Sequence, residues 1–142
     1  MYSKTKEVGD LGEKIAEDYL KKKGYKILDK NYEFKISKTP KKGEIDIIAK
    51  PRRNIFEVLR GKKDDTIHFI EVKTLQKTQE EFFHPEEKVD FKKSKKLIKT
   101  AESWLMKNKI PLNTKWQIDI IAILLEKEKA KISHFENAIP YF

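Results

Sequence analysis

The sequence of 142 residues predicts a single α/β domain, residues 1–142, in which a mixed central β-sheet is flanked by helices. Three observations lead to this fold class. Two segments space their apolar residues as helices do, several short segments are rich in β-branched and aromatic residues, and one of the helices separates two of these strands. A strand–helix–strand unit crosses over right-handed, so we expect those two strands to be parallel.

The first helix is predicted from Asp10 to about Lys23. Asp10 is a good N-cap residue, and Gly24 supplies a C-terminal stop. The apolar face comprises Leu11, Ile15, Ala16, Tyr19 and Leu20. Glu13 lies at the edge of this face and three residues after Asp10, which is the spacing of a capping box. From this segment alone, capping is favoured over a role of Glu13 in a functional site.

Strands are predicted at residues 25–28, 31–36, 43–49, 67–73, 116–125 and 130–135. Residues 37–42, with Pro40, form a turn between the second and third of these segments. The connection 50–65 is long for a hairpin, so we expect a local excursion around its apolar residues, which are Ile55, Phe56, Val58 and Leu59. A second polar segment, 74–89, is expected either to be mobile or to cover the site; it contains Phe82, Phe83 and Pro85.

A second helix is predicted from Asp90, its N-cap, to about Lys107. Its buried face comprises Leu97, Ile98, Ala101, Trp104 and Leu105. Its N-terminal half carries five lysines: Lys92, Lys93, Lys95, Lys96 and Lys99. The helix dipole disfavours cations at that end. Contact with phosphate and a merely solvated face both account for these lysines, and the sequence leaves the two open.

Carboxylates interrupt two strands that are otherwise apolar. In Gly43-Glu44-Ile45-Asp46-Ile47-Ile48-Ala49, strict alternation puts Glu44, Asp46 and Ile48 on one face and Ile45, Ile47 and Ala49 on the other. In the segment 67–73, one face comprises Ile67, Phe69, Glu71 and Lys73. Carboxylates on a largely buried strand are costly unless they are paired or bind a cation. A metal site accounts for both strands.

The chemistry of the ligands favours Mg²⁺ or Mn²⁺. The chain has no cysteine, and its three histidines (His68, His84 and His134) do not have the sequence spacing of metal ligands, so we expect oxygen ligands. Such an ion assists phosphodiester hydrolysis, and a lysine two residues after a carboxylate lies on the same strand face, where it can orient water or offset charge. Glu-x-Lys occurs three times, but only Glu71 and Lys73 follow a strand that carries an acidic residue, Asp46.

The net charge indicates the class of partner. With 32 Lys and Arg against 23 Asp and Glu, the formal charge is +9, which points to nucleic acid first and an anionic membrane surface second. The alternative is a Lys/Glu-rich surface like that of heat-adapted proteins. The N-terminus does not resemble a signal peptide, the longest apolar run (120–125) is too short to span a bilayer, and no amphipathic anchor is evident, so we expect a cytoplasmic protein without a membrane partner.

The combined motifs resemble the YraN-like family, and the order αβββαβ resembles the PD-(D/E)XK nuclease superfamily. The residues that carry the resemblance are Gly12-Glu13 through Tyr19-Leu20, Gly24-Tyr25, Gly43-Glu44-Ile45-Asp46, Phe69-Ile70-Glu71-Val72-Lys73, Val89 through Lys93, and Glu136-Asn137-Ala138. The resemblance spans roughly residues 9 to 140 and implies a restriction-endonuclease-like αβββαβ core, similar to that of archaeal Holliday junction resolvases. Two departures are the longer connection 50–65 and Leu75, which stands at a position that is often basic.

The resemblance also implies roles for individual residues. Asp46 and Glu71 match the metal ligands, Glu13 on the first helix matches a carboxylate beside the metal, and Lys73 matches the catalytic lysine. Glu44 is expected as an outer ligand or as a partner of a surface lysine. Lys93 matches a basic position on the second helix. Together with Lys92 and Lys96 on the same lysine-bearing helix, it is expected to bind phosphate. Asp119 is interpreted as structural, with a partner inside the sheet.

Two functions follow from the sequence. The first is a Mg²⁺-dependent endonuclease that hydrolyses DNA, with DNA favoured over RNA and branched or damaged DNA as the expected substrate. The alternative is a non-catalytic nucleic-acid-binding or assembly factor, in which the carboxylates pair with lysines instead of a metal. Junction nucleases with a similar core often act as dimers, so a homodimer is compatible with either function, although no segment indicates a dimer face.

Overall fold

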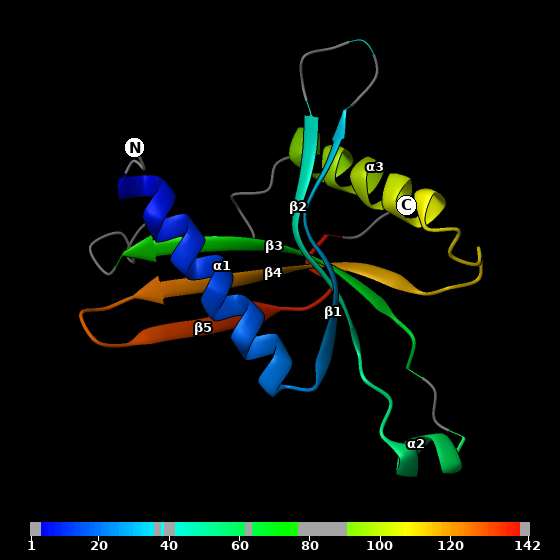
Figure 1. Ribbon diagram of the computed structural model, residues 1–142. Helices are drawn as coiled ribbons and strands as arrows, with labels where there is room; N and C mark the ends of the chain where they lie inside the picture. Colours follow the sequence, from blue (N-terminus) through cyan, green and yellow to red (C-terminus); the bar gives the residue numbers. More distant parts are fainter. Residues whose placement is uncertain (1–3, 36–37, 39–41, 62–63, 77–90, 140–142) are drawn as a thin grey trace.

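The protein is a mixed α/β structure built around one five-stranded sheet, as the computed structural model in Figure 1 shows for residues 4–35, 38, 42–61, 64–76 and 91–139. The strands lie in the order β1-β2-β3-β4-β5, with bounds Tyr25–Lys35, Lys42–Pro51, Ile67–Gln76, Trp116–Leu125 and Ala130–Phe135. The helices are α1 (Lys4–Lys22), α2 (Ile55–Leu59) and α3 (Phe91–Lys107). The predicted mixed α/β class is therefore confirmed.

The β3–α3–β4 unit has the predicted parallel pairing. Ile67 lies opposite Trp116, and the register continues without interruption to Gln76 opposite Leu125. All other neighbouring strands pair antiparallel. The strand predicted at 116–125 is the most deeply buried one, because it lies second from the edge of the sheet and both of its faces are covered.

Each face of the sheet has its own apolar core. On one face, α1 contributes Ala16 and Leu20, which pack in a cluster with Tyr25, Ile47, Ala49, Ile70, Ile121 and Ile123. On the other face, α3 contributes Leu97, Ala101 and Trp104 to a second cluster, whose strand residues are Ile45, Ile48, Ile67, Phe69 and Ile118. Figure 1 shows α1 crossing one face while α3 lies on the other. Apart from Leu11, which is half exposed, both predicted helix faces are buried or partly buried.

The first helix begins earlier than predicted. It starts at Lys4, so Asp10 lies inside the helix and is not its N-cap. The capping box of Asp10 with Glu13 is therefore wrong. Residues 4–8 continue the helix, and a glycine inside a helix, here Gly9, costs only about 1 kcal/mol. The predicted stop is confirmed: Gly24 has a φ of +98°, and its amide bonds to Lys21 O at 3.1 Å.

Two strand predictions need correction. The segments 25–28 and 31–36 form one strand, β1, because a bulge at Leu28 absorbs the extra residue between Ile27 and Asp29. In β2 the expected alternation fails, since Ile45 packs in the α3 cluster while Ile47 packs in the α1 cluster. The break falls where β2 stops pairing with β3: the regular register comprises only Ile47, Ile48 and Ala49 opposite Ile70, Phe69 and His68.

The excursion predicted in the connection 50–65 is present as the short helix α2. Several predictions fall outside the described residues: the Asp90 N-cap, the roles of Phe82, Phe83 and Pro85 in the segment 74–89, and Pro40 in the turn at 37–42. Within the described ranges, none of the helices has the length and apolar character needed to cross a bilayer.

Candidate functional site

The candidate site lies where β2 and β3 separate. Beyond the pair Ile47–Ile70 the two strands no longer pair, and in Figure 1 they run in clearly different directions. At this point the side chain of Asp46 replaces the missing backbone partner, because its Oδ2 accepts a hydrogen bond from the amide of Val72 at 2.7 Å. The carboxylate of β2 is thereby fixed beside the Glu71–Lys73 segment of β3.

Asp46 is held in an environment that disfavours its charge. Burial raises its pKa to about 8, the negative charges of Glu71, Glu13 and Glu44 act in the same direction, and the hydrogen bond from Val72 opposes them. The protonated form of Asp46 is therefore favoured over the carboxylate. A bound cation would reverse this balance, since it would favour the ionised carboxylate.

Glu13 reaches the site from α1. Burial raises its pKa, a hydrogen bond with Asp46 lowers it, and the negative charges of Asp10 and Glu44 raise it further. A hydrogen bond between two carboxyl groups requires a proton on one of them, and the raised pKa of Asp46 supplies it. The structure thus brings Glu13 and Asp46 into direct contact, as the prediction of a site role for Glu13 requires.

Gly12 allows α1 to approach β3 closely enough for this contact. A Cβ atom built at Gly12 would overlap the side chain of Thr74, which follows Lys73 on β3. Beside the helix lies a cavity of about 230 Å³. Its lining residues are Asp10, Glu13, Lys14, Glu17, Lys30, Asn31, Asp46 and Ile47. Four of these side chains are acidic and two are lysines, of which Lys30 pairs with Glu17 at 3.3 Å.

Glu71 and Lys73 lie on the opposite side of Asp46, toward α3. The Oε1 atom of Glu71 contacts the Nζ atoms of both Lys73 (3.1 Å) and Lys93 (3.2 Å). Burial lowers the pKa of Lys73, but Glu71, Lys93 and Asp46 outweigh this effect and raise it. For Lys93, burial and the neighbouring Lys73 prevail over Glu71, so its pKa is lowered. Two lysines therefore share one carboxylate oxygen at the edge of the site.

The positions of the three predicted carboxylates indicate whether they could hold a divalent ion. Asp46 lies among carboxyl groups that disfavour its ionised form, and a bound cation would offset that effect. The oxygens of Glu13, Asp46 and Glu71, however, do not all lie within 4.8 Å of one another. The three carboxylates therefore do not converge on one ion as they stand, while Glu13 contacts Asp46 directly. Glu44 is exposed and acts by its charge alone.

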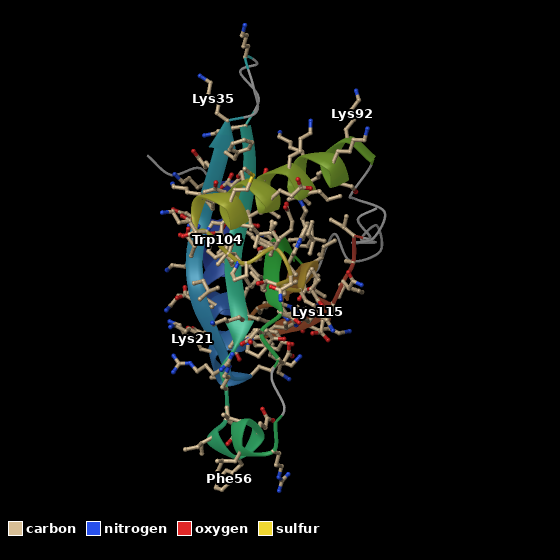
Figure 2. All side chains as sticks on the ribbon, turned by 90° about the vertical axis from the view of Figure 1, so that its right-hand side faces the viewer. Lys21, Lys35, Phe56, Lys92, Trp104 and Lys115 are labelled. Carbon is tan, nitrogen blue, oxygen red and sulfur yellow. The ribbon has the colours of Figure 1, made fainter. Side chains whose placement is uncertain are left out.

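The lysines of α3 differ in their orientation. Lys93 turns toward Glu71, whereas Lys92 is exposed at the N-terminal end of the helix, and Figure 2 shows it projecting away from the body of the molecule. Lys96 is half-buried, and its backbone carbonyl accepts a hydrogen bond from Thr100. The end of α3 nearest the site is thus strongly basic.

A second cluster surrounds Asp119, which is fully buried. Its Oδ2 contacts His68 Nδ1 at 2.6 Å and His134 Nε2 at 2.8 Å. Its Oδ1 accepts bonds from Gln117 Nε2 at 2.8 Å and the Asn137 amide at 2.9 Å. Burial tends to raise the pKa of Asp119, but these hydrogen bonds lower it well below its usual range. Asp119 is therefore partnered within the sheet, as predicted.

No pattern in the sequence indicates that two histidines converge on Asp119. Among the described residues, the group whose potential ligand atoms lie within 4.8 Å of one another comprises His68, Asp119 and Glu136. The prediction from histidine spacing did not anticipate this group, because 51 residues separate His68 from Asp119 in the chain. His84 lies outside the described residues. Of the residues that line the cavity, Glu13 and Asp46 were predicted as site residues. The others, Asp10 and Lys30 among them, were missed, since no sequence motif marks them.

Comparison with known proteins yields one family. The sequence profile described as "Uncharacterised protein family UPF0102" matches residues 12–123. A UPF0102 protein of Clostridioides difficile is 44% identical over 135 residues, covering 94% of this chain and 97% of the relative. UPF0102 proteins of Alkaliphilus oremlandii and Flavobacterium psychrophilum are 38% and 32% identical over 136 residues. These alignments cover 94% and 96% of this chain and 98% and 96% of the two relatives.

Proposed function

The chain belongs to the UPF0102 family, and we propose that it is a divalent-metal-dependent endonuclease that acts on DNA. One observation carries the proposal. Asp46 is a half-buried carboxyl group that lies near Glu13 and Glu71 at the place where two strands separate. The lysine that pairs with Glu71, Lys73, lies two residues further along the strand. The arrangement agrees with a restriction-endonuclease-like core and with the YraN-like resemblance of the sequence.

Asp46 and Glu71 would hold Mg²⁺ or Mn²⁺. When bound, such an ion supplies charge neutralisation at the phosphate and lowers the pKa of a water molecule. Val72 fixes the orientation of Asp46, and Glu13 can take up the proton that Asp46 gives up on ionisation. Lys73 and Lys93 would be drawn from Glu71 toward the substrate phosphate, where Lys73 orients the attacking water and offsets developing charge.

The basic end of α3 would hold the DNA backbone. Lys92 is exposed and Lys96 half-exposed on the same helix as Lys93, so the three can contact neighbouring phosphates. The formal charge of +9 favours a polyanionic substrate in general. DNA is favoured over RNA, and branched or damaged DNA over intact duplex, through the resemblance to junction nucleases. A cytoplasmic location and a homodimer are further parts of the proposal.

A specific observation favours a second candidate, a non-catalytic nucleic-acid-binding factor. Glu71 already has two basic partners, Lys73 and Lys93, and Glu13 is hydrogen-bonded to Asp46. A site whose charges are internally balanced in this way can persist without a metal. The two candidates share the lysine-bearing surface and differ only in whether the carboxylates exchange their partners for an ion.

The test compares cleavage and metal binding in the full chain. Wild type, Asp46→Asn and Glu71→Gln are assayed with Mg²⁺ and Mn²⁺ on duplex, single-stranded, flap and four-way DNA and on RNA. Glu33→Gln, which removes an exposed carboxylate on β1, is the matched control. Cleavage by wild type and by Glu33→Gln, with none by Asp46→Asn or Glu71→Gln, supports the nuclease. Metal-independent binding without cleavage supports the second candidate, and cleavage that persists in both site variants contradicts the proposal.

A further inference from the structure

The helix α2 displays large apolar side chains to solvent. The exposed fractions are 68% for Ile55, 66% for Phe56 and 77% for Leu59, and none of the five residues of α2 is buried. Ile55 and Leu59 are one helical turn apart, with Phe56 beside them, so the three form one continuous face. Contiguous exposed apolar surface of this kind marks an interaction site.

The arm that carries α2 comprises residues 52–61 and 64–65, and side-chain hydrogen bonds hold it in place. The side chain of Asn54 caps the helix by accepting a hydrogen bond from the amide of Phe56 at 2.9 Å. Gly61 ends it with a φ of +76°. At the base of the arm, the guanidinium of Arg53 binds the carboxylate of Asp65 through two oxygens, at 2.6 and 2.7 Å. Figure 2 shows Phe56 at the end of the arm that lies farthest from the sheet.

Positive charge flanks the apolar face. Arg52 precedes α2 and Arg60 follows it; both are exposed, and neither forms an ion pair with another described residue. The single acidic residue within α2 is Glu57. A small apolar tip between two arginines is complementary to a nucleic acid, whose stacked bases are apolar and whose backbone is anionic.

We propose that α2 is a wedge that inserts Phe56 between the bases of a DNA duplex while Arg52 and Arg60 bind the flanking phosphates. This inference rests on the proposed action on DNA and adds a second contact point to it. A second copy of the chain is a poorer occupant, because a stable dimer buries about 800 Å² per partner and one helix of five residues offers far less.

The position of the wedge determines what kind of DNA it would favour. Ile67, the first residue of β3, lies at the α2 end of the strand, and Glu71 is four residues further on, about 13 Å away. Figure 1 shows α2 beyond the joined ends of β2 and β3 and well apart from α1. Insertion of Phe56 requires a base step to unstack, and unstacking costs least at a bulge or branch. The wedge therefore favours DNA that is already distorted.

The experiment measures insertion and affinity separately. A duplex with 2-aminopurine beside a two-nucleotide bulge reports unstacking by its fluorescence, and a labelled copy reports binding by anisotropy. Phe56→Ser is compared with wild type and with Leu112→Ser, which removes an apolar side chain that is fully exposed elsewhere. We expect roughly 5- to 150-fold weaker binding of the bulged duplex by Phe56→Ser, the loss of one base–aromatic stack, and no fluorescence increase. Leu112→Ser should behave as wild type.

Other results overturn the wedge. If Phe56→Ser binds and unstacks the bulged duplex as wild type does, the wedge is wrong while the nuclease proposal stands, and the cleavage assay decides the latter. If wild type binds none of the DNA substrates, both fail. If Phe56→Ser instead loses binding to vesicles of phosphatidylcholine and phosphatidylserine, or changes the sedimenting mass, with DNA binding unchanged, the apolar face serves a membrane or a second copy.

Discussion

The Oδ2 atom of Asp46 accepts a hydrogen bond of 2.7 Å from the amide of Val72, so a side chain of β2 takes the place of its backbone at the point where β2 leaves β3. The bond has two consequences. It satisfies an amide that the diverging strands would otherwise leave without a partner. It also fixes a half-buried carboxyl group between Glu13 on one side and Glu71 on the other.

The first prediction concerns the charge of Asp46. Its pKa is raised from about 3.9 in an unfolded chain to about 8 in the folded protein, mainly by burial. Its contribution to stability is therefore complete below about pH 4 and is lost as the pH rises through about 8. Asp46→Asn cannot ionise. We expect the variant to be more stable than wild type at pH 9, by at least about 1 kcal/mol in urea unfolding, and to show a smaller difference at pH 6.

Metal ions provide the control for this prediction. If Asp46 is a ligand, Mg²⁺ or Mn²⁺ should stabilise the wild-type protein at pH 9, because binding requires the ionised carboxylate. The same ions should have little effect on Asp46→Asn. An equal stability difference between variant and wild type at both pH values would contradict the raised pKa.

The second prediction concerns the close approach of α1 to β3. Gly12→Ala places a methyl group against Thr74, and overpacking of this kind costs about 1–3 kcal/mol or displaces the helix. Because the helix carries Glu13, we also expect reduced metal-dependent activity. Gly9→Ala is the matched control on the same helix, since a Cβ there meets no atom within 4 Å. That change should stabilise the protein by about 0.5–1 kcal/mol.

Thermal and urea unfolding of the two glycine variants measure this difference. The additional change Thr74→Ala should recover part of the stability lost in Gly12→Ala, because it removes the nearest overlapping atom, Oγ1 of the threonine. Equal stability of Gly12→Ala and Gly9→Ala would show that α1 moves away from β3 without cost.

The third prediction concerns the basic end of α3. For a DNA duplex, log Kd should rise linearly with the logarithm of the salt concentration. Each lysine that contacts a phosphate should contribute about 0.9 to the slope. We expect Lys92→Ala and Lys96→Ala each to lower the slope by about 1 without a change in substrate preference. Lys129→Ala, in the exposed turn between β4 and β5, is the control and should leave the slope unchanged. Unaltered slopes in the α3 variants would indicate a solvated helix face.

The sequence predicted most strands and α3 well, because the spacing of apolar residues that indicates them is local. The segments 116–125 and 130–135 are observed as predicted, and the parallel pairing of β3 with β4 followed from the handedness of the crossover. The start of α1 was wrong because Asp10 is a good cap only where a helix begins, and the preceding residues continue this helix. The local pattern favoured Glu13 as the capping-box partner of Asp10, whereas in the structure Glu13 contacts Asp46.

Features that depend on distant residues could not be read from the sequence. The strict alternation expected for β2 fails at Asp46, because the position of the break depends on where β3 diverges. The convergence of His68 and His134 on Asp119 joins three strands, and His68 lies 51 residues before Asp119 in the chain. In contrast, the pairing of Glu71 with Lys73 follows directly from the spacing of two residues on one strand face.

The fourth prediction concerns Asp119. Its folded-state pKa is depressed, so the stability that it contributes is present above the unfolded pKa of about 3.9 and is lost as the pH falls below it. Asp119→Asn leaves His68 and His134 with a mismatched amide in place of a carboxylate. We expect urea unfolding at pH 7 to show a loss of about 2–4 kcal/mol in the free energy of unfolding, and this deficit should shrink below about pH 4.

The control is Asp18→Asn, which removes only an exposed pair with Lys14 and should change stability by less than about 1 kcal/mol. A deficit that stays constant down to pH 3 would mean that packing, and not the charge of Asp119, holds the three strands together at this point.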